Sequence, residues 1–180
     1  MNTRWLRRLL VEPHPRLVWR FARGLGWGGR RALRRFERRR RRGGTFPAFL
    51  FVSVTSRCNL SCQGCWVSPD PPRAFAPETL DAVIAGAARR GSTFFGLLGG
   101  EPLLYPPLFD VLARHPTCTF LLFTNGLLLD ARAAARMRRL GNVTPMISIE
   151  GLDTVGDARR GGQGVYRRAL EKGVGQKVEL

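Results

Sequence analysis

Short apolar runs alternate with amphipathic segments through the larger, C-terminal part of the chain. Four of these runs predict strands, at residues 49–54, 93–98, 119–123 and 143–149. Each run is continuous enough in apolar residues to be buried on both faces of a sheet. Apolar residues at helical spacing predict helices between and after the strands, at residues 77–90, 107–114, 131–140 and 163–172.

This alternation of strands and helices predicts an α/β fold. A repeated strand-helix unit calls for a parallel sheet with right-handed crossovers, which is either open or curls toward a barrel. In folds of this kind the chemistry lies at the C-terminal ends of the strands. The segments that directly follow each predicted strand are therefore the places to search for a site.

The first 44 residues follow a different and strongly basic pattern. Apolar residues recur at helical spacing near residues 5–10 and 17–25, and residues 30–42 predict a helix with arginines on almost every side. Residues 1–44 hold fifteen arginines against two glutamates, which accounts for +13 of the formal net charge of +17. Gly43 and Gly44 mark a boundary. We expect a basic, amphipathic helical N-terminal arm at residues 1–44 and a folded domain at residues 45–180.

The basic arm suggests an anionic partner. Its aromatic and aliphatic side chains beside many arginines fit the surface of an anionic membrane, which is the partner we favour. The same residues could neutralise phosphates and stack on the bases of a nucleic acid, and a solvated helix needs no partner at all. No apolar run reaches the roughly 20 residues that span a bilayer, and the N-terminal runs are too short for a secretory signal. We expect a cytoplasmic protein, with association at a membrane surface as an option.

Three of the four cysteines lie close together, directly after the first predicted strand. Cys58, Cys62 and Cys65 have the spacing Cys-x3-Cys-x2-Cys. A loop at this place can bring three thiolates to one inorganic centre. A 4Fe-4S cluster normally takes four protein thiolates, so three would leave one iron free to bind another molecule. Clustered thiols of this kind suit a reducing compartment better than a disulfide framework does.

Two other interpretations of the cysteines stay open. A structural zinc site needs four ligands, but neither the two histidines nor Cys118 stands at the usual finger spacing. Cys62 and Cys65 could form a dithiol redox pair, which leaves Cys58 without a role. Cys118 opens the third predicted strand, where we expect a small core residue and not a ligand.

Glycine and polar residues follow the other three predicted strands. After the second strand, two glycines without Cβ atoms allow a ligand to approach the backbone, a glutamate adds negative charge, and a proline stiffens the exit. At the end of the fourth strand, a serine and a glutamate two residues apart can point to the same side. These residues are Gly99, Gly100, Glu101 and Pro102 after the second strand, Asn125 after the third, and Ser148 and Glu150 at the end of the fourth.

Together these motifs resemble the radical S-adenosylmethionine (SAM) superfamily, over about residues 46–170. The cysteine spacing resembles the signature of that family, and Gly-Gly-Glu-Pro resembles its second motif in sequence and in place. The resemblance implies a 4Fe-4S cluster on Cys58, Cys62 and Cys65, and a SAM molecule at the neighbouring strand ends. It also implies a partial (β/α) barrel of the radical SAM type, with about four βα units.

The resemblance further implies the residues that contact SAM. The Gly-Gly-Glu-Pro segment suits the methionyl amine, and the polar residues of the fourth strand end contact the ribose or the methionyl part. Arg160 resembles an arginine that often meets the methionyl carboxylate, although a solvated helix charge is the alternative. The implied SAM-binding residues are Gly99, Gly100, Glu101, Pro102, Asn125, Ser148, Glu150 and Arg160.

The implied activity is that of a radical SAM enzyme. Such an enzyme takes an electron from a reductant such as flavodoxin or ferredoxin and cleaves SAM reductively to a 5'-deoxyadenosyl radical. The radical then abstracts hydrogen from a substrate, which this sequence does not identify. A radical SAM core usually has six βα units, so we expect the core at residues 45–180 to be its N-terminal part only. The alternatives are a nucleic-acid-binding protein with a structural metal site and an inactive truncated remnant.

Overall fold

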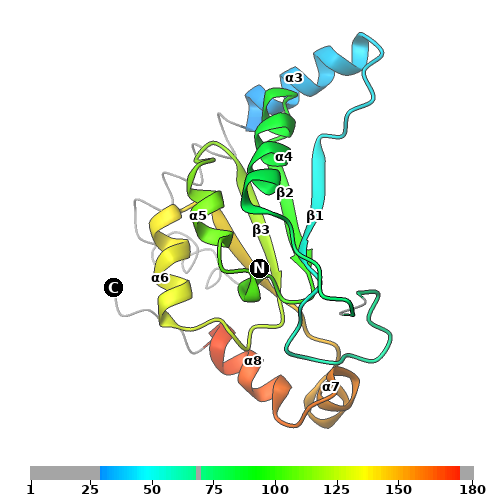
Figure 1. Ribbon diagram of the computed structural model, residues 1–180, viewed down its shortest axis with the longest axis vertical. Coiled ribbons are helices and arrows are strands. Elements are labelled where there is room, and N and C mark those ends of the chain that lie inside the picture. Colours follow the sequence, from blue (N-terminus) through cyan, green and yellow to red (C-terminus); the bar gives the residue numbers. More distant parts are fainter. Residues whose placement is uncertain (1–28, 68–69, 175–180) are drawn as a thin grey trace, which may run out of the picture.

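A single parallel sheet organises the computed structural model, which describes residues 29–67 and 70–174 (Figure 1). Its strands are β1 (Phe49–Thr55), β2 (Phe94–Gly99), β3 (Thr119–Thr124) and β4 (Val143–Ile147). They lie side by side in the order β1-β2-β3-β4, and each pair is parallel. The α/β fold and all four predicted strands are confirmed, although β4 ends two residues earlier than expected. The helices predicted near residues 5–10 and 17–25 lie outside the described residues.

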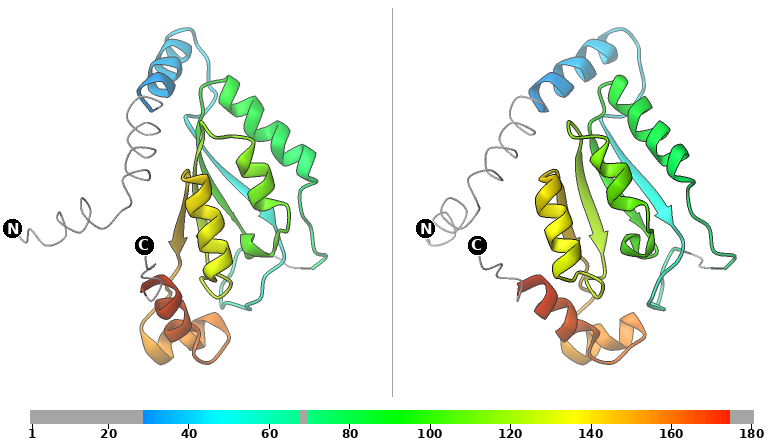
Figure 2. Two further views of the ribbon diagram at one scale, coloured as in Figure 1. Left: turned by 90° about the vertical axis from the view of Figure 1, so that its left-hand side faces the viewer. Right: turned by 60° about the vertical axis from the view of Figure 1, so that its left-hand side comes forward.

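Helices α4, α5 and α6 cross from one strand to the next on the same face of the sheet (Figure 2). Two helices follow β4, and the sequence predicted only the second of them. None of the described helices is both long and apolar enough to cross a membrane. The helices are α3 (Gly29–Arg41), α4 (Pro77–Arg89), the short 3-10 helix η2 (Pro102–Leu104), α5 (Leu108–Ala113), α6 (Ala131–Leu140), α7 (Asp153–Arg160) and α8 (Val165–Val174).

Local signals in the sequence set the ends of these helices. Pro77 occupies the first position of α4, where its missing N–H costs nothing. The carboxylate of Asp130 accepts a hydrogen bond from the amide of Ala133 at 2.7 Å and so caps the start of α6. Gly141 ends α6 with a φ of 68°, a conformation that glycine adopts without strain.

The hydrophobic core lies between the three crossover helices and the face of the sheet that they cover. Leu97 and Leu122 are fully buried there, and the rings of Phe95 and Phe120 stack with their centroids 5.5 Å apart. Leu80 and Ile84 of α4 are also fully buried. Because the strands packed beneath this layer are parallel, the C-terminal ends of all four lie at the same end of the sheet (Figure 1).

The opposite face of the sheet, which we call the open face, is not covered by α4, α5 or α6 (Figure 2). Phe51 is 60% exposed there and Met146 is 42% exposed. The expectation that every strand is buried on both faces is therefore wrong for β1 and β4. Parallel pairing assigns to the open face Phe51 and Ser53 of β1, Gly96 and Leu98 of β2, Leu121 and Phe123 of β3, and Thr144 and Met146 of β4.

The rings of the open face pack across a glycine. A Cβ atom on Gly96 would lie 2.5 Å from the ring of Phe51, so only glycine leaves room for that ring. The ring centroids of Phe51 and Phe123 are 5.9 Å apart across this position. A row of apolar side chains thus faces outward along the middle of the sheet, and such a surface favours association.

We predict that a chain of residues 1–180 self-associates through the open face. The double variant Phe51→Lys/Met146→Lys should lower the average mass in solution, because two charges on this surface oppose its burial. Light scattering behind a sizing column measures that mass.

The control is Leu152→Lys/Val155→Lys, which adds the same two charges at exposed apolar residues outside the open face. It should leave self-association unchanged. A wild-type chain that stays monomeric at every concentration would contradict this prediction.

Candidate functional site

The predicted site residues gather at the end of the sheet where all four strands terminate, with α7 and α8 beside it (Figure 1). The loop that follows β1 carries the three clustered cysteines. Cys58 and Cys62 are half-buried and Cys65 is exposed, and all three are free thiols. Three sets of contacts hold this loop against the neighbouring strand ends and α7.

The first set joins the exits of β1 and β2 through their backbones. The amide of Gly100 donates to the carbonyl of Thr55, and the amide of Glu101 donates to the carbonyl of Arg57, both at 2.7 Å. A Cβ atom on Gly99 would collide with the carbonyl of Thr55, and one on Gly100 with that of Arg57. The two glycines therefore let one strand exit pack directly against the segment that leads into Cys58, a need that the sequence alone did not reveal.

The second set centres on Glu101, whose side chain is fully buried. Its carboxylate accepts hydrogen bonds from the hydroxyl of Thr124 at 2.8 Å, from the amide of Asn125 at 2.8 Å and from the amide of Leu103 at 3.0 Å. Burial raises the pKa of Glu101, while these hydrogen bonds and the positive charge of Arg160 oppose that rise. Glu101 thus ties the exit of β2 to the end of β3 from inside the protein.

Asn125 extends this connection to the cysteine loop. Its side-chain amide donates to the carbonyl oxygen of the Asn59 side chain at 2.8 Å, and its own side-chain oxygen accepts from the amide of Leu127 at 3.0 Å. Asn59 follows Cys58 directly in the sequence. It is a positioning residue that sequence analysis missed, because nothing local links it to Asn125, 66 residues away.

The third set fixes the middle of the cysteine loop against the end of α7. The amide of Gln63 donates to the carbonyl of Arg159 at 2.7 Å. Gly161 ends the helix with a φ of 70°, and a Cβ there would lie 2.6 Å from the carbonyl oxygen of Ser61. Arg160 lies between these two contacts and is only 4% exposed. Among the described residues, its buried Nε atom finds no hydrogen-bond partner.

The three thiols and Arg160 share one electrostatic environment. Burial raises the pKa of Cys62, and the charge of Arg160 opposes this rise, whereas the neighbouring Cys58 and Cys65 reinforce it. Within residues 29–67 and 70–174, no three His, Cys, Asp or Glu side chains are already arranged around a metal position. Thiolates repel one another until a metal joins them, and metal ligands are rarely preformed without it.

A narrow hollow at the end of β4 brings further predicted residues together. Glu150 at its rim pairs with Arg159 at 3.9 Å, whereas the neighbouring Arg160 is buried. The hollow is lined by Ser148, Ile149, Glu150, Gly151, Gly156, Arg160, Tyr166 and Ala169.

Asp157 of α7 positions the next helix beside this hollow. Its carboxylate accepts hydrogen bonds from the amides of Tyr166, at 2.8 Å, and Gly164. The bond from Tyr166 is the main cause of the lowered pKa of Asp157. The carboxylate of Asp157 on α7 thus caps the start of α8, and this contact places Tyr166 at the hollow.

Pro102, which was predicted as a site residue, and Cys118, which was predicted as a core residue, are both buried in structural positions. Pro102 is buried at the first position of η2. Cys118 is 2% exposed in the core, and burial raises its pKa to about 11, so that it stays a protonated thiol. The expectation that Cys118 is a core residue is confirmed.

Comparisons with known proteins bear on the family and the fold of the chain. The sequence profile of the Radical SAM superfamily matches residues 52–172. The chain is 30% identical over 131 residues to the sporulation killing factor maturation protein SkfB of Bacillus subtilis, which covers 69% of this chain and 31% of SkfB. It is 36% identical over 136 residues to the pre-heme d1 synthase of Dinoroseobacter shibae, covering 71% of this chain and 33% of that enzyme.

The fold also matches a solved structure, that of Streptococcus suis SuiB bound to S-adenosylmethionine. The TM-score is 0.61 at 19% sequence identity, over 74% of this chain and 33% of SuiB. At this identity the likeness concerns the fold. The chain spans about a third of the length of each of these relatives.

We predict that Glu101→Ala lowers the free energy of unfolding by about 2–4 kcal/mol, because it leaves buried donors without an acceptor. Urea unfolding followed by circular dichroism measures this loss. The control is Glu150→Ala, which removes a half-exposed carboxylate at the same end of the sheet and should cost less than about 0.5 kcal/mol. Equal effects of the two variants would show that the buried carboxylate is not a main support of the strand ends.

Proposed function

We propose, from the premise that this chain belongs to the Radical SAM superfamily, that its strand-end site holds a 4Fe-4S cluster and binds SAM. The observation that carries this proposal is the arrangement around Cys62. Three free thiols of one loop share their charge environment with a buried arginine whose Nε lacks a partner among the described residues. Soft thiolates suit iron-sulfur clusters, and an unpaired guanidinium suits a carboxylate.

In this proposal Cys58, Cys62 and Cys65 are the cluster ligands, and one iron is left open for SAM. When bound, the cluster supplies the electron that cleaves SAM to methionine and a 5'-deoxyadenosyl radical, which abstracts hydrogen from the substrate. The protein supplies ligands, orientation and exclusion of water. A flavodoxin or a ferredoxin is the proposed class of reductant.

Arg160 is the proposed partner of the methionyl carboxylate of SAM. Arg160 is buried, its charge acts on the thiol of Cys62, and it lines the hollow with Ser148 and Glu150. A buried guanidinium without a full set of acceptors is costly, and a bound carboxylate would relieve that cost. Ser148 and Glu150 are proposed to contact the ribose or the methionyl part of the same molecule.

The Gly99 to Pro102 segment and Asn125 complete the proposed SAM wall. Glu101 acts from inside, because its carboxylate already accepts three hydrogen bonds from the chain itself. Its negative charge lies behind the exit of β2 and favours a cation such as the methionyl amine there. Asn125 holds Asn59, and through it the first part of the cysteine loop.

The substrate and the reaction outcome extend beyond what this chain carries. Its match covers about a third of each relative, and one relative is named for maturing a sporulation killing factor while another is named as a pre-heme d1 synthase. We propose hydrogen abstraction as the shared step and leave the substrate class open. A cytoplasmic location is part of the proposal, because the cluster and its free thiols need a reducing compartment.

We predict that anaerobic reconstitution with iron and sulfide yields about one 4Fe-4S cluster per chain. Replacing Cys58, Cys62 or Cys65 by Ala should abolish stable incorporation, measured as visible absorption and as bound iron and sulfide. Cys118→Ala is the control, because Cys118 is a buried core thiol, and it should bind as much iron as the wild type. Tight binding of one zinc without iron-sulfur absorption would contradict the proposal.

We predict that Arg160→Gln weakens SAM binding to the reconstituted protein by about tenfold, because a charge-assisted pair is lost. The shift of the electron paramagnetic resonance spectrum on addition of SAM measures binding without any turnover. Arg159→Gln is the matched control: its side chain is about half exposed and pairs with Glu150, and its effect should stay within about twofold. Equal weakening in both variants would remove Arg160 from the proposed role.

A further inference from the structure

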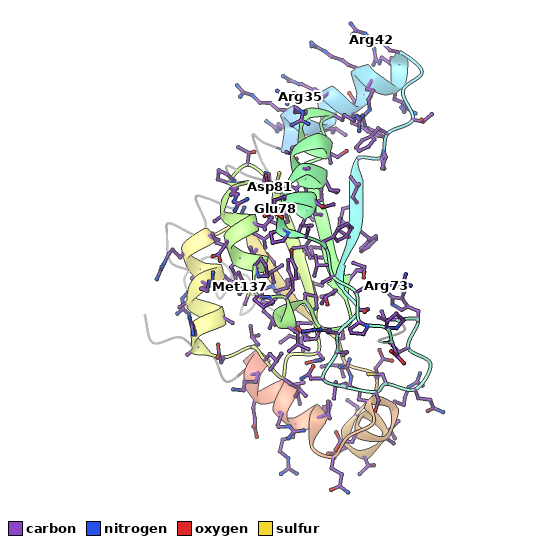
Figure 3. The ribbon with its side chains drawn as sticks, viewed as in Figure 1. Arg35, Arg42, Arg73, Glu78, Asp81 and Met137 are labelled. Carbon is purple, nitrogen blue, oxygen red and sulfur yellow. The ribbon has the colours of Figure 1, made fainter. Side chains whose placement is uncertain are left out.

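A second concave surface lies at the opposite end of the sheet from the strand-end site. Figure 3 shows Arg35 and Arg42 of this surface at one end of the molecule, whereas Arg73, whose carbonyl accepts from the amide of Ser56 beside the cysteine loop, lies well away from them, below the middle of the view. The surface is a cavity of about 330 Å³ between α3 and the C-terminal end of α4. Among the described residues, its lining consists of Arg35, Arg38, Arg39, Arg42, Gly44, Arg89 and Arg90.

This arginine pocket is built by helical spacing. Arg35, Arg38, Arg39 and Arg42 recur at intervals of three and four residues, so they share one face of α3 and the turn that follows it. Six arginines thus line one cavity, and its lining, within the described part of the chain, includes no carboxylate. Like charges held this close repel one another unless an anion lies between them.

Arg39 gives a second, independent observation that points to an acceptor at this surface. It donates one hydrogen bond to the carbonyl of Phe46, and its guanidinium lies 5.5 Å from the ring centroid of Phe36 and 5.4 Å from that of Phe46. Its Nε and Nη1 atoms are buried, and neither finds a hydrogen-bond partner among the described residues. Buried donors of a charged group are normally satisfied, so these two call for an acceptor.

Helix ends explain only part of this arrangement. Arginines in the last turns of α3 and α4 are favoured by the negative ends of the helix dipoles. That effect works equally well for side chains that point into solvent. It does not account for Arg39, which lies against two rings, or for Arg90, whose guanidinium lies 5.0 Å from the ring centroid of Phe46.

We propose that the arginine pocket binds a multiply charged phosphate group, supplied by the headgroup of an anionic phospholipid or by a soluble oligophosphate. Phosphate oxygens match the planar fork of a guanidinium, and several negative charges on one group match several arginines. A single carboxylate would leave most of the six charges unbalanced. The pocket is remote from the cysteine loop, so this function is separate from the proposed SAM chemistry.

The test compares two triple variants of the full chain that remove the same charge. Arg35→Gln/Arg38→Gln/Arg42→Gln removes three of the four arginine charges on the pocket face of α3. The control, Arg30→Gln/Arg34→Gln/Arg41→Gln, changes exposed residues on another face of the same helix. Calorimetry with inorganic tripolyphosphate tests the soluble source, and flotation with phosphatidic acid in phosphatidylcholine vesicles, against pure phosphatidylcholine, tests the lipid source.

The pocket variant should bind the phosphate probe at least about tenfold more weakly than the wild type, and the control should stay within about twofold. Gly44→Ala, which changes no charge, should also weaken binding, because its Cβ would collide with the stem of Arg39. Circular dichroism confirms that each variant is folded.

Binding of either probe that follows this pattern supports the proposal. Absence of binding to both probes by the wild type would overturn it. Equal losses in the two triple variants would also overturn it, since they would indicate diffuse attraction to the whole basic helix.

Discussion

The candidate site depends on one buried carboxylate. Glu101 fixes the exit of β2 to the end of β3, and Asn125, which donates to it, holds Asn59 in the cysteine loop. A charged group in this interior is tolerated only because three donors and a nearby arginine compensate its lost hydration. Two hydrogen bonds, from Asn125 to Glu101 and from Asn125 to Asn59, thus link the position of the cysteine loop to a buried carboxylate.

Backbone packing supplies the second support. At the exits of β1 and β2 and again at the end of α7, glycines allow carbonyl groups and amides of separate segments to come into direct contact. The loop that carries the three thiols is therefore attached at its start and at its middle, while Cys65 at its end stays exposed. Cys65 joins the attached part of the loop through its amide, which donates to the carbonyl of Cys62 at 3.2 Å.

The strands and most helices could be predicted because local periodicity and end signals determine them, as with Asp130 and Gly141 at the two ends of α6. The cysteines and the Gly-Gly-Glu-Pro segment could be found for a similar reason, since each motif is contiguous. The partners of Glu101 on β3, by contrast, lie more than twenty residues away, and Asn59 meets Asn125 only in the folded chain. The exposure of Phe51 and Met146 was also missed, because an apolar run does not tell which face of a sheet the crossover helices cover.

The close approach at Gly99 and Gly100 has a consequence for how sequence variation in this protein would be interpreted. Any side chain at either position collides with a carbonyl of the neighbouring segment before a ligand is involved. Selection for folded protein would therefore reject the same substitutions as selection for cofactor binding. Relatives that still fold but no longer bind a cofactor should retain both glycines. Retention of the two glycines therefore indicates a conserved fold and not a retained activity.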